Sequence, residues 1–116
     1  MSSPGQPTEG RETAIIYNVT SKVDQGISAA WLKWIREVHI AELVDTGCFT
    51  HAIILRLLET DDTDGPTYAV QYHARSKALY NQYITRYSQD MQQKSTALWG
   101  NKVISFRSVL QVEASG

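Results

Sequence analysis

The stretch "CFTHAIILRLLETDDTDGPTYAVQYHA" (Cys48–Ala74) decides the fold, because it contains two apolar runs on either side of an acidic turn. The runs cover residues 48–59 and 66–74, and both are rich in the β-branched and aromatic residues that favour strands. Two strands that follow one another across a short turn predict an antiparallel hairpin.

A helix is predicted before this hairpin, beginning at Ile27. Its apolar residues recur with helical period up to Val38, and a second apolar stripe, on nearly the opposite side, then covers residues 40–44. One straight helix cannot bury both stripes. We therefore predict a break or kink at His39–Ile40, then a short helical turn that Gly47 closes in the left-handed conformation.

A second, long helix is predicted after the hairpin, with Ser76 as its N-cap and Gly100 at its end. The outermost segments, "TAIIYNVT" (residues 13–20) and "KVISFRSVLQVE" (residues 102–113), have the pattern of strands. The order of elements is then βαββαβ. It predicts an α+β fold of the ferredoxin-like type, a four-stranded antiparallel sheet with both helices on one face.

Length and composition are those of one small globular domain. We expect residues 13–113 to form it, with a disordered leader (residues 1–12) and a disordered tail (residues 114–116). The net charge of -1 gives no electrostatic reason to expect nucleic acid or a membrane as partner. A single cysteine, Cys48, and the lack of a signal peptide or a membrane-spanning run indicate a cytoplasmic protein.

The two faces of the sheet are predicted to differ. The face toward the helices is expected to carry Ile15, Tyr17, Val19, Ile53, Leu55, Leu57, Tyr68, Val70, Tyr72, Ile104 and Phe106. The open face is expected to carry Ile16, Asn18, Thr50, Ala52, Ile54, Arg56, Thr67, Ala69, Gln71, His73, Val103, Ser105, Arg107 and Val109. An apolar surface interspersed with polar groups favours a partner that covers it, so we expect a homodimer through this face, a dimeric α+β barrel.

Several short motifs, "IIYNV", "WLKWIREVHI", "TGCFT" and "YAVQY", carry a resemblance to a known family. In their order and spacing the chain resembles an uncharacterised bacterial family of small ferredoxin-like proteins, described as a domain of unknown function. That family tends to have Pro where this chain has Ala41, so the helix-breaking residue that usually follows the predicted break is absent here. More distantly, the chain is similar to the dimeric α+β-barrel superfamily, which includes cofactor-free monooxygenases, small isomerases and ligand-sensing domains.

The candidate site residues follow from these phases. Asn18, Arg56, Gln71, His73 and Arg107 are predicted on the open face, where they would either bind an anionic or carbonyl-bearing small molecule or form a hydrogen-bond network across the dimer interface. His51 is expected to be structural.

His39, at the predicted break, is a weak candidate for a general base. The alternative is a half-buried histidine that caps the break and rests against Leu32 or Leu43. Trp34 is expected to serve packing more than the stacking of a cofactor.

Metal and RNA binding are disfavoured. "TDDTDG" resembles a calcium loop, but Thr60 and Gln71 stand where the first and last ligands belong. RNA-recognition modules stack bases on sheet aromatics, whereas Tyr68 and Tyr72 are predicted to face the helices. No cofactor is expected. Two functional hypotheses follow: a homodimeric module that binds a small ligand or a partner through the sheet face, or a cofactor-free enzyme that works between sheet and helices.

Overall fold

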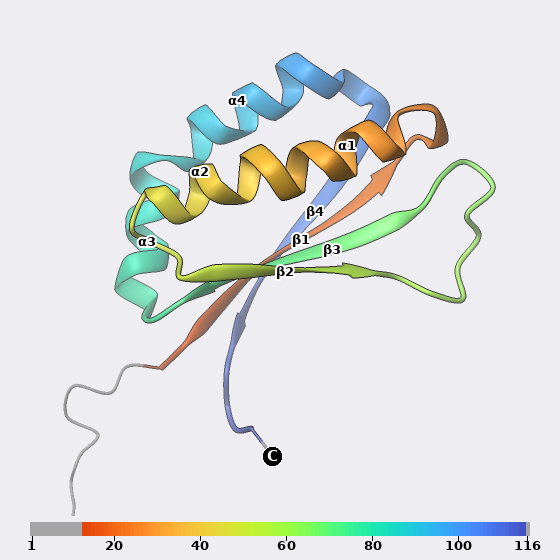
Figure 1. The fold of residues 1–116 in the computed structure, drawn as a ribbon. Helices are drawn as coiled ribbons and strands as arrows, with labels where there is room; N and C mark the ends of the chain where they lie inside the picture. The colour runs from red at the N-terminus through yellow and green to blue at the C-terminus, as the bar shows by residue number, and fades with distance from the viewer. Residues whose placement is uncertain (1–12, 116) are drawn as a thin grey trace, which may run out of the picture.

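Residues 13–115, which the computed structural model describes, form one antiparallel sheet whose helices all lie on the same face (Figure 1). The strands are β1 (Ile15–Val23), β2 (His51–Arg56), β3 (Thr67–Ala74) and β4 (Val103–Gln111), in the spatial order β2-β3-β1-β4. This arrangement confirms the ferredoxin-like fold and the central hairpin. The leader expected at residues 1–12 lies outside the described residues.

The first helical arm follows β1 and a short turn, η1 (Gln25–Ile27). It consists of α1 (Ser28–Trp34), a π-helical turn η2 (Ile35–His39) and α2 (Ile40–Asp45). The predicted break at His39–Ile40 is wrong, because the helix continues: the Ile40 amide donates to the carbonyl of Ile35, five residues back. The extra residue in this turn rotates the stripe that follows, so Ile35 and Leu43 are both buried.

Two further details concern the exposure of one residue in this arm and the way the arm ends. Val38, the last residue of the apolar stripe predicted for the first helix, is 44% exposed. Gly47 ends the arm with φ +82°, the left-handed conformation predicted for it.

The second helical arm consists of α3 (Lys77–Arg86) and α4 (Ser88–Trp99), followed by the turn η3 (Gly100–Lys102). Ser76 is the predicted N-cap, and its hydroxyl accepts from the Leu79 amide at 3.2 Å. The single long helix that we predicted is instead divided at Tyr87. The Ser88 hydroxyl donates to the Ile84 carbonyl at 2.8 Å, a local bond that favours bending at this point.

Strands β1 and β3 have the predicted phase, whereas the two edge strands do not. Residues paired across neighbouring strands point to the same face. Ile54 pairs with buried Val70, and Arg107 pairs with Val19, so both lie on the helix side and not on the open face. Helix-side positions also include Ala52, Arg56, Val103, Ser105 and Val109. Conversely, the open face carries His51, Ile53, Leu55, Ile104 and Phe106.

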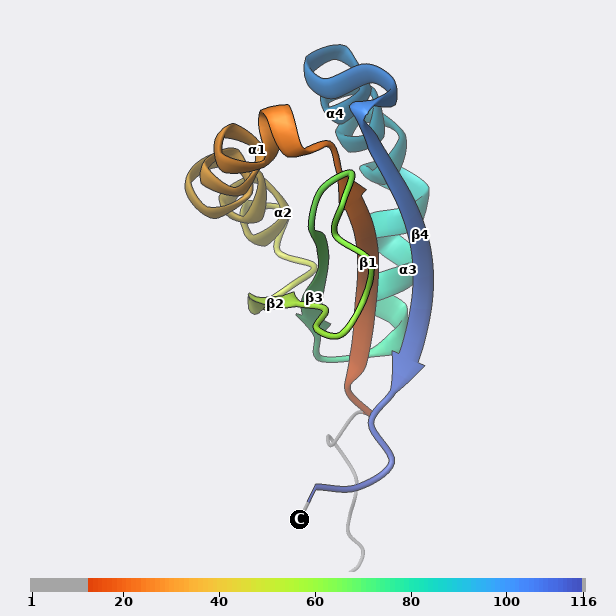
Figure 2. The same ribbon diagram turned by 90° about the vertical axis from the view of Figure 1, so that its right-hand side faces the viewer.

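The core lies between the sheet and the two arms (Figure 2). Trp31 of α1 stacks on Tyr68 of β3, with ring centroids 5.5 Å apart. Phe49 packs edge-on against Tyr83 of α3 at 4.9 Å. Tyr68 and Tyr72 therefore face the helices, as predicted. Within residues 13–115, the structure contains no helix that is long and apolar enough to cross a membrane.

Candidate functional site

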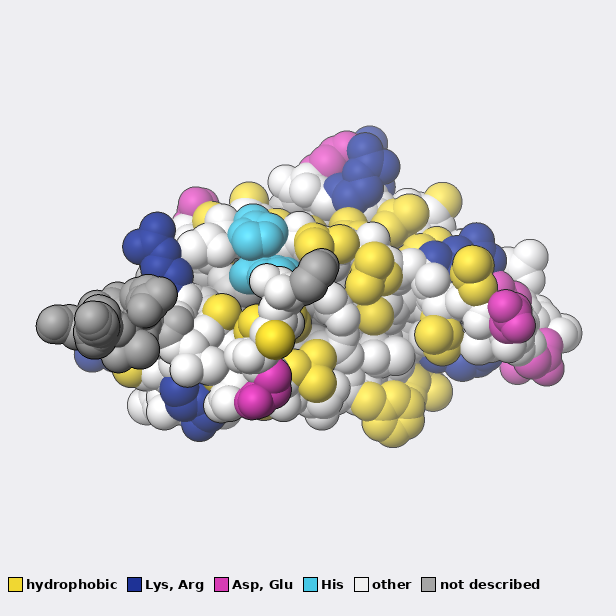
Figure 3. All heavy atoms as spheres, turned by 90° about the horizontal axis from the view of Figure 1, so that it is seen from below, with side chains coloured by type: hydrophobic (Ala, Val, Ile, Leu, Met, Phe, Trp, Pro, Cys, Tyr) yellow, Lys and Arg dark blue, Asp and Glu magenta, His cyan; other side chains and the backbone are white. Residues whose placement is uncertain are grey.

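The open face of the sheet is strongly apolar at both edges (Figure 3). On β4, Phe106 is 71% exposed and Ile104 is 58% exposed. On β2, Ile53 and Leu55 are each 43% exposed. Lys22 is the one charged side chain that the strand pairings place on this face within β1 to β4. Exposed apolar side chains along two edges of a sheet are typical of protein interaction surfaces.

A polar row crosses the centre of the open face. Asn18 of β1 is 8% exposed, and its carbonyl oxygen accepts from the Gln71 amide of β3 at 3.3 Å. The Asn18 amide nitrogen donates to the hydroxyls of Thr20 at 3.0 Å and Ser108 at 3.3 Å. Asn18 and Gln71 are thus brought together on this face, as the sequence predicted, and their groups largely satisfy one another.

Two histidines stack near one end of the same face. The rings of His51 and His73 lie 4.2 Å apart, and the Thr50 hydroxyl contacts Nδ1 of His51 at 2.9 Å. Nε2 of His73 is buried without a hydrogen-bond partner. Burial lowers the pKa of His73, and the neighbouring His51 lowers it further. Both effects favour the neutral form of His73.

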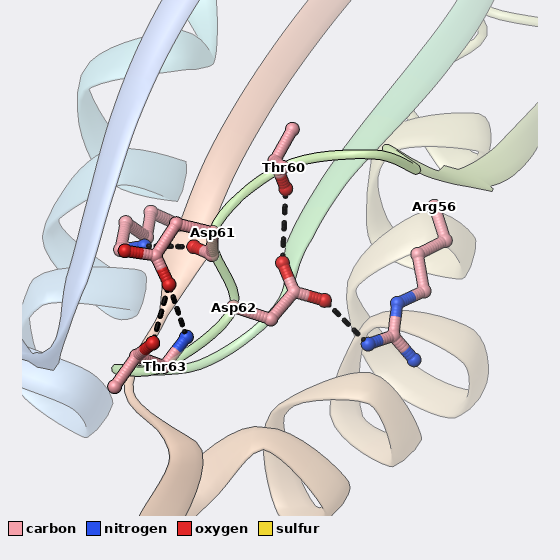
Figure 4. Close-up of polar contacts among 6 residues, drawn as sticks. Arg56, Thr60, Asp61, Asp62 and Thr63 are labelled. Carbon is pink, nitrogen blue, oxygen red and sulfur yellow. Dashed lines mark hydrogen bonds and ion pairs between the residues drawn. The ribbon is translucent and has the colours of Figure 1, made fainter.

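Arg56 is not part of the open face. It lies at the end of β2, where its guanidinium pairs with the Asp62 carboxylate at 2.7 Å (Figure 4). The bonds from Arg56 and Thr60 lower the pKa of Asp62. Asp61 in the same turn accepts from the backbone and the hydroxyl of Thr63. Arg56 is thus neutralised by its own hairpin turn, away from the other candidate residues.

A cleft opens on the opposite side of the sheet, between the two helical arms; we call it the helix-side cleft. Its walls are Tyr17, Val19, Ser21, Trp31, Trp34, Ile35, His39, Leu43, Val70, Tyr72, Tyr83, Met91, Gln92, Ser95, Val103, Ser105 and Arg107. The inner volume is about 40 Å³, room for a few water molecules. Within residues 13–115, no group of three or more metal-ligating side chains could hold a metal ion.

Arg107 and Tyr17 form the polar floor of this cleft. Nε of Arg107 donates to the Tyr17 hydroxyl at 3.1 Å. Burial raises the pKa of Tyr17, and the Arg107 charge opposes that shift only in part, so the phenol keeps its proton at neutral pH. Beside them, the hydroxyls of Ser21 and Ser105 share a hydrogen bond of 2.8 Å.

His39 lines the cleft instead of capping a broken helix. Its ring stacks on Trp34, with centroids 4.5 Å apart, and meets Tyr72 edge-on. Nδ1 lies 3.8 Å from a Glu42 carboxylate oxygen, which is too long for a hydrogen bond, and is otherwise unpartnered. Burial lowers the pKa of His39 to about 4 although Glu42 acts in the opposite direction. With so low a pKa the imidazole is a weak proton acceptor, and no carboxylate is hydrogen-bonded to it, so general-base catalysis is not what this site supports best.

Trp34 connects the first helical arm to the second. It is half-buried and meets Trp99 of α4 edge-on at 5.8 Å. Further along, Glu42 of α2 and Lys94 of α4 form a surface ion pair at 3.0 Å. These contacts join the two arms beside the helix-side cleft.

The predicted site residues therefore divide among three places. Asn18, Gln71 and His73 lie on the open face, Trp34, His39 and Arg107 line the cleft, and Arg56 belongs to the hairpin turn. The polar cleft residues that sequence reasoning missed are Tyr17, Ser21, Tyr72, Tyr83, Gln92, Ser95 and Ser105. One signal was present, because a tyrosine placed on the helix side of a sheet needs a partner for its hydroxyl.

The fold and the cleft define a small α+β protein of the ferredoxin-like class. The model of one family, a domain of unknown function (DUF4286), matches residues 14–113. The chain therefore belongs to this family, which confirms the resemblance that the short motifs indicated.

Among solved structures, the chain is similar to a dimeric ferredoxin-like protein from an uncultured marine organism. The TM-score is 0.66 at 10% sequence identity, and the match covers 90% of this chain and 100% of the other. At this identity the likeness concerns the fold alone. The comparison with curated proteins found no match.

Proposed function

We propose that the protein acts as a homodimeric module in which the open faces of two copies pack against each other. The observation that carries the proposal is the exposure of large apolar side chains on β2 and β4, Phe106 and Ile104 above all. Water contact with such a surface is unfavourable by roughly 25 cal/mol per Å² of apolar area, so covering it stabilises an assembly.

A second copy of the same chain fits this face better than a partner of opposite charge. Lys22 is the one charged residue that strand pairing places on it, so the face offers little to an acidic or a basic surface. Interface centres in proteins are similarly poor in charged residues. The polar row around Asn18 runs between two apolar edges, a pattern that a twofold axis can match with itself. The structurally similar marine protein is itself described as dimeric.

The test is the oligomeric state of the full chain in sedimentation velocity. Phe106→Glu places a charge in the proposed interface and should weaken the dimer at least about thirtyfold. Leu98→Glu is the matched control: Leu98 is 57% exposed on α4, on the other side of the sheet, and this variant should remain dimeric. Leu55→Glu on the second edge provides an independent substitution. Ile54 and Arg56 are unsuitable, because they do not lie on the open face.

A wild-type chain that sediments as a monomer at micromolar concentration contradicts the proposal. So does a dimer that Phe106→Glu and Leu98→Glu weaken equally.

A further inference from the structure

The helix-side cleft continues outward into a wider opening, which we call the cleft mouth. It is lined by Gln92, Ser95, Thr96, Gly100, Val103, Ser105 and Arg107, and it shares five of these residues with the inner cleft. Its volume is about 180 Å³. For comparison, an apolar cavity of about 150 Å³ is sufficient to hold benzene. The opening can therefore admit a short chain or one small ring.

The cleft mouth holds one permanent positive charge. Arg107 is the only Lys or Arg among the residues that line the inner cleft or the mouth. No carboxylate of residues 13–115 forms an ion pair with it. Nε is engaged by the Tyr17 hydroxyl, which leaves the two terminal nitrogens of the guanidinium without a protein acceptor in the described chain. Those nitrogens form the planar, two-pronged donor that matches a carboxylate.

Neutral donors surround this charge. Because the Tyr17 hydroxyl accepts from Arg107, its own proton is free to be donated. Gln92 and Ser95, on the facing side of α4, make no side-chain hydrogen bond with any described residue. His39 adds no second positive charge at pH 7, since burial keeps its imidazole neutral. The cleft thus offers one charge, several donors and little room.

We propose that the cleft mouth binds a small monocarboxylate, no larger than benzoate, with its carboxylate on Arg107 and its hydrocarbon part toward the apolar inner wall. Phosphate monoesters fit less well, because a charge of about -1.5 to -2 would meet only one arginine. The inner wall is formed by Trp34, Ile35, Leu43 and Met91, which suits a hydrocarbon group of a few atoms. This binding site lies within one copy of the chain and does not depend on the proposed dimer.

The test is titration of the full-length chain with acetate, butyrate and benzoate, followed by tryptophan fluorescence and by calorimetry. Trp34 lines the inner cleft, so a ligand there should change its emission. We expect saturation by at least one carboxylate at millimolar concentration. Benzamide, which has the shape of benzoate without its charge, and inorganic phosphate should bind at least about tenfold more weakly.

The matched variants are Arg107→Gln and Arg86→Gln. Arg107→Gln should weaken carboxylate binding at least tenfold, whereas Arg86, exposed at the end of α3, should be replaceable without effect. Ser95→Phe places a large side chain in the mouth from α4 and should also abolish binding. This second variant keeps the test decisive if Arg107→Gln fails to fold. The proposal is overturned if none of the three carboxylates saturates the wild type. It is equally overturned if benzoate binds wild type and Arg107→Gln alike, or binds no better than benzamide.

Discussion

At the scale of single residues, His39 shows how burial decides chemistry. Its side chain is 13% exposed and stacked on Trp34, and its Nδ1 makes no hydrogen bond with any described residue. A charged imidazole would be poorly solvated there, although Glu42 would favour it; Lys94 and Arg107 oppose it. The neutral form is therefore favoured in the folded protein, and this preference makes stability depend on pH.

We expect the free energy of unfolding to fall as the pH drops from 6.5 to 4. His39 has a pKa of about 4 when folded and about 6.5 when unfolded, so the unfolded chain takes up the proton first. Above pH 6.5 His39 is largely neutral in both states, so its titration hardly changes the free energy of unfolding. Between pH 7 and pH 5, the wild type should lose about 2 kcal/mol more than His39→Phe, which keeps an aromatic ring but cannot titrate.

Urea denaturation of both proteins at the two pH values measures this difference. The carboxylates and the other two histidines are common to both proteins, so their contributions to the pH dependence cancel in the comparison. Equal losses would mean that the His39 imidazole is solvated when the protein is folded.

The positions of some candidate site residues could be predicted from the sequence, and those of others could not. Asn18 and Gln71 were placed correctly, because β1 and β3 alternate clearly between large apolar and polar residues. Arg107 was predicted as a ligand-binding or interface residue but was assigned to the wrong face, since its strand is apolar on both sides. The convergence of Arg107, Tyr17 and Ser95 depends on three elements distant in the chain, and no local pattern encodes it.

At the scale of secondary-structure elements, the hairpin turn before β3 is held by a close backbone approach. Gly65 has φ +141°, and a Cβ at this position would lie 1.9 Å from the carbonyl oxygen of Val23 and 2.7 Å from the Gln25 nitrogen. Gln25 donates to the Asp64 carbonyl at 2.9 Å in the same place. The turn is thereby docked against the end of β1.

We expect Gly65→Ala to lower the free energy of unfolding by at least about 3 kcal/mol, because backbone must move to admit the methyl group. Gly47→Ala is the control. Gly47 also has a positive φ, +82°, but a Cβ there meets nothing within 4 Å, so the cost should be only about 1 to 2 kcal/mol. Chemical denaturation at one pH compares the two variants. Equal costs would show that the turn is not packed against β1.

The errors at this scale have physical causes. The sequence in and after β2, "AIILRLL", is apolar at both parities, so alternation could not choose its face, and pairing with β3 did. In the first helical arm, two apolar stripes of different phase indicated a discontinuity correctly. A π turn resolves it with one extra residue, and nothing in local propensity distinguishes this solution from a kink.

At the scale of the whole molecule, the fold was predictable because element order and type were clear even where phases were not. Six elements in the order βαββαβ leave few ways to form one sheet whose face is covered by the helices. The larger apolar residues of the edge strands nevertheless lie on the open side. The prediction placed these residues on the helix side because it assumed that large apolar side chains are buried within a single copy of the chain.

The near absence of charge on the open face sets how the proposed dimer should respond to its surroundings. Without ion pairs to screen, its dissociation constant should change little between low and high concentrations of sodium chloride. Apolar contacts weaken on cooling, so the two copies should part more readily near 4 °C than near 25 °C, with a negative heat capacity of association. Sedimentation at both temperatures and calorimetric dilution measure this. An association that tightens in the cold and loosens with added salt would be electrostatic, and this sheet would then have no part in it.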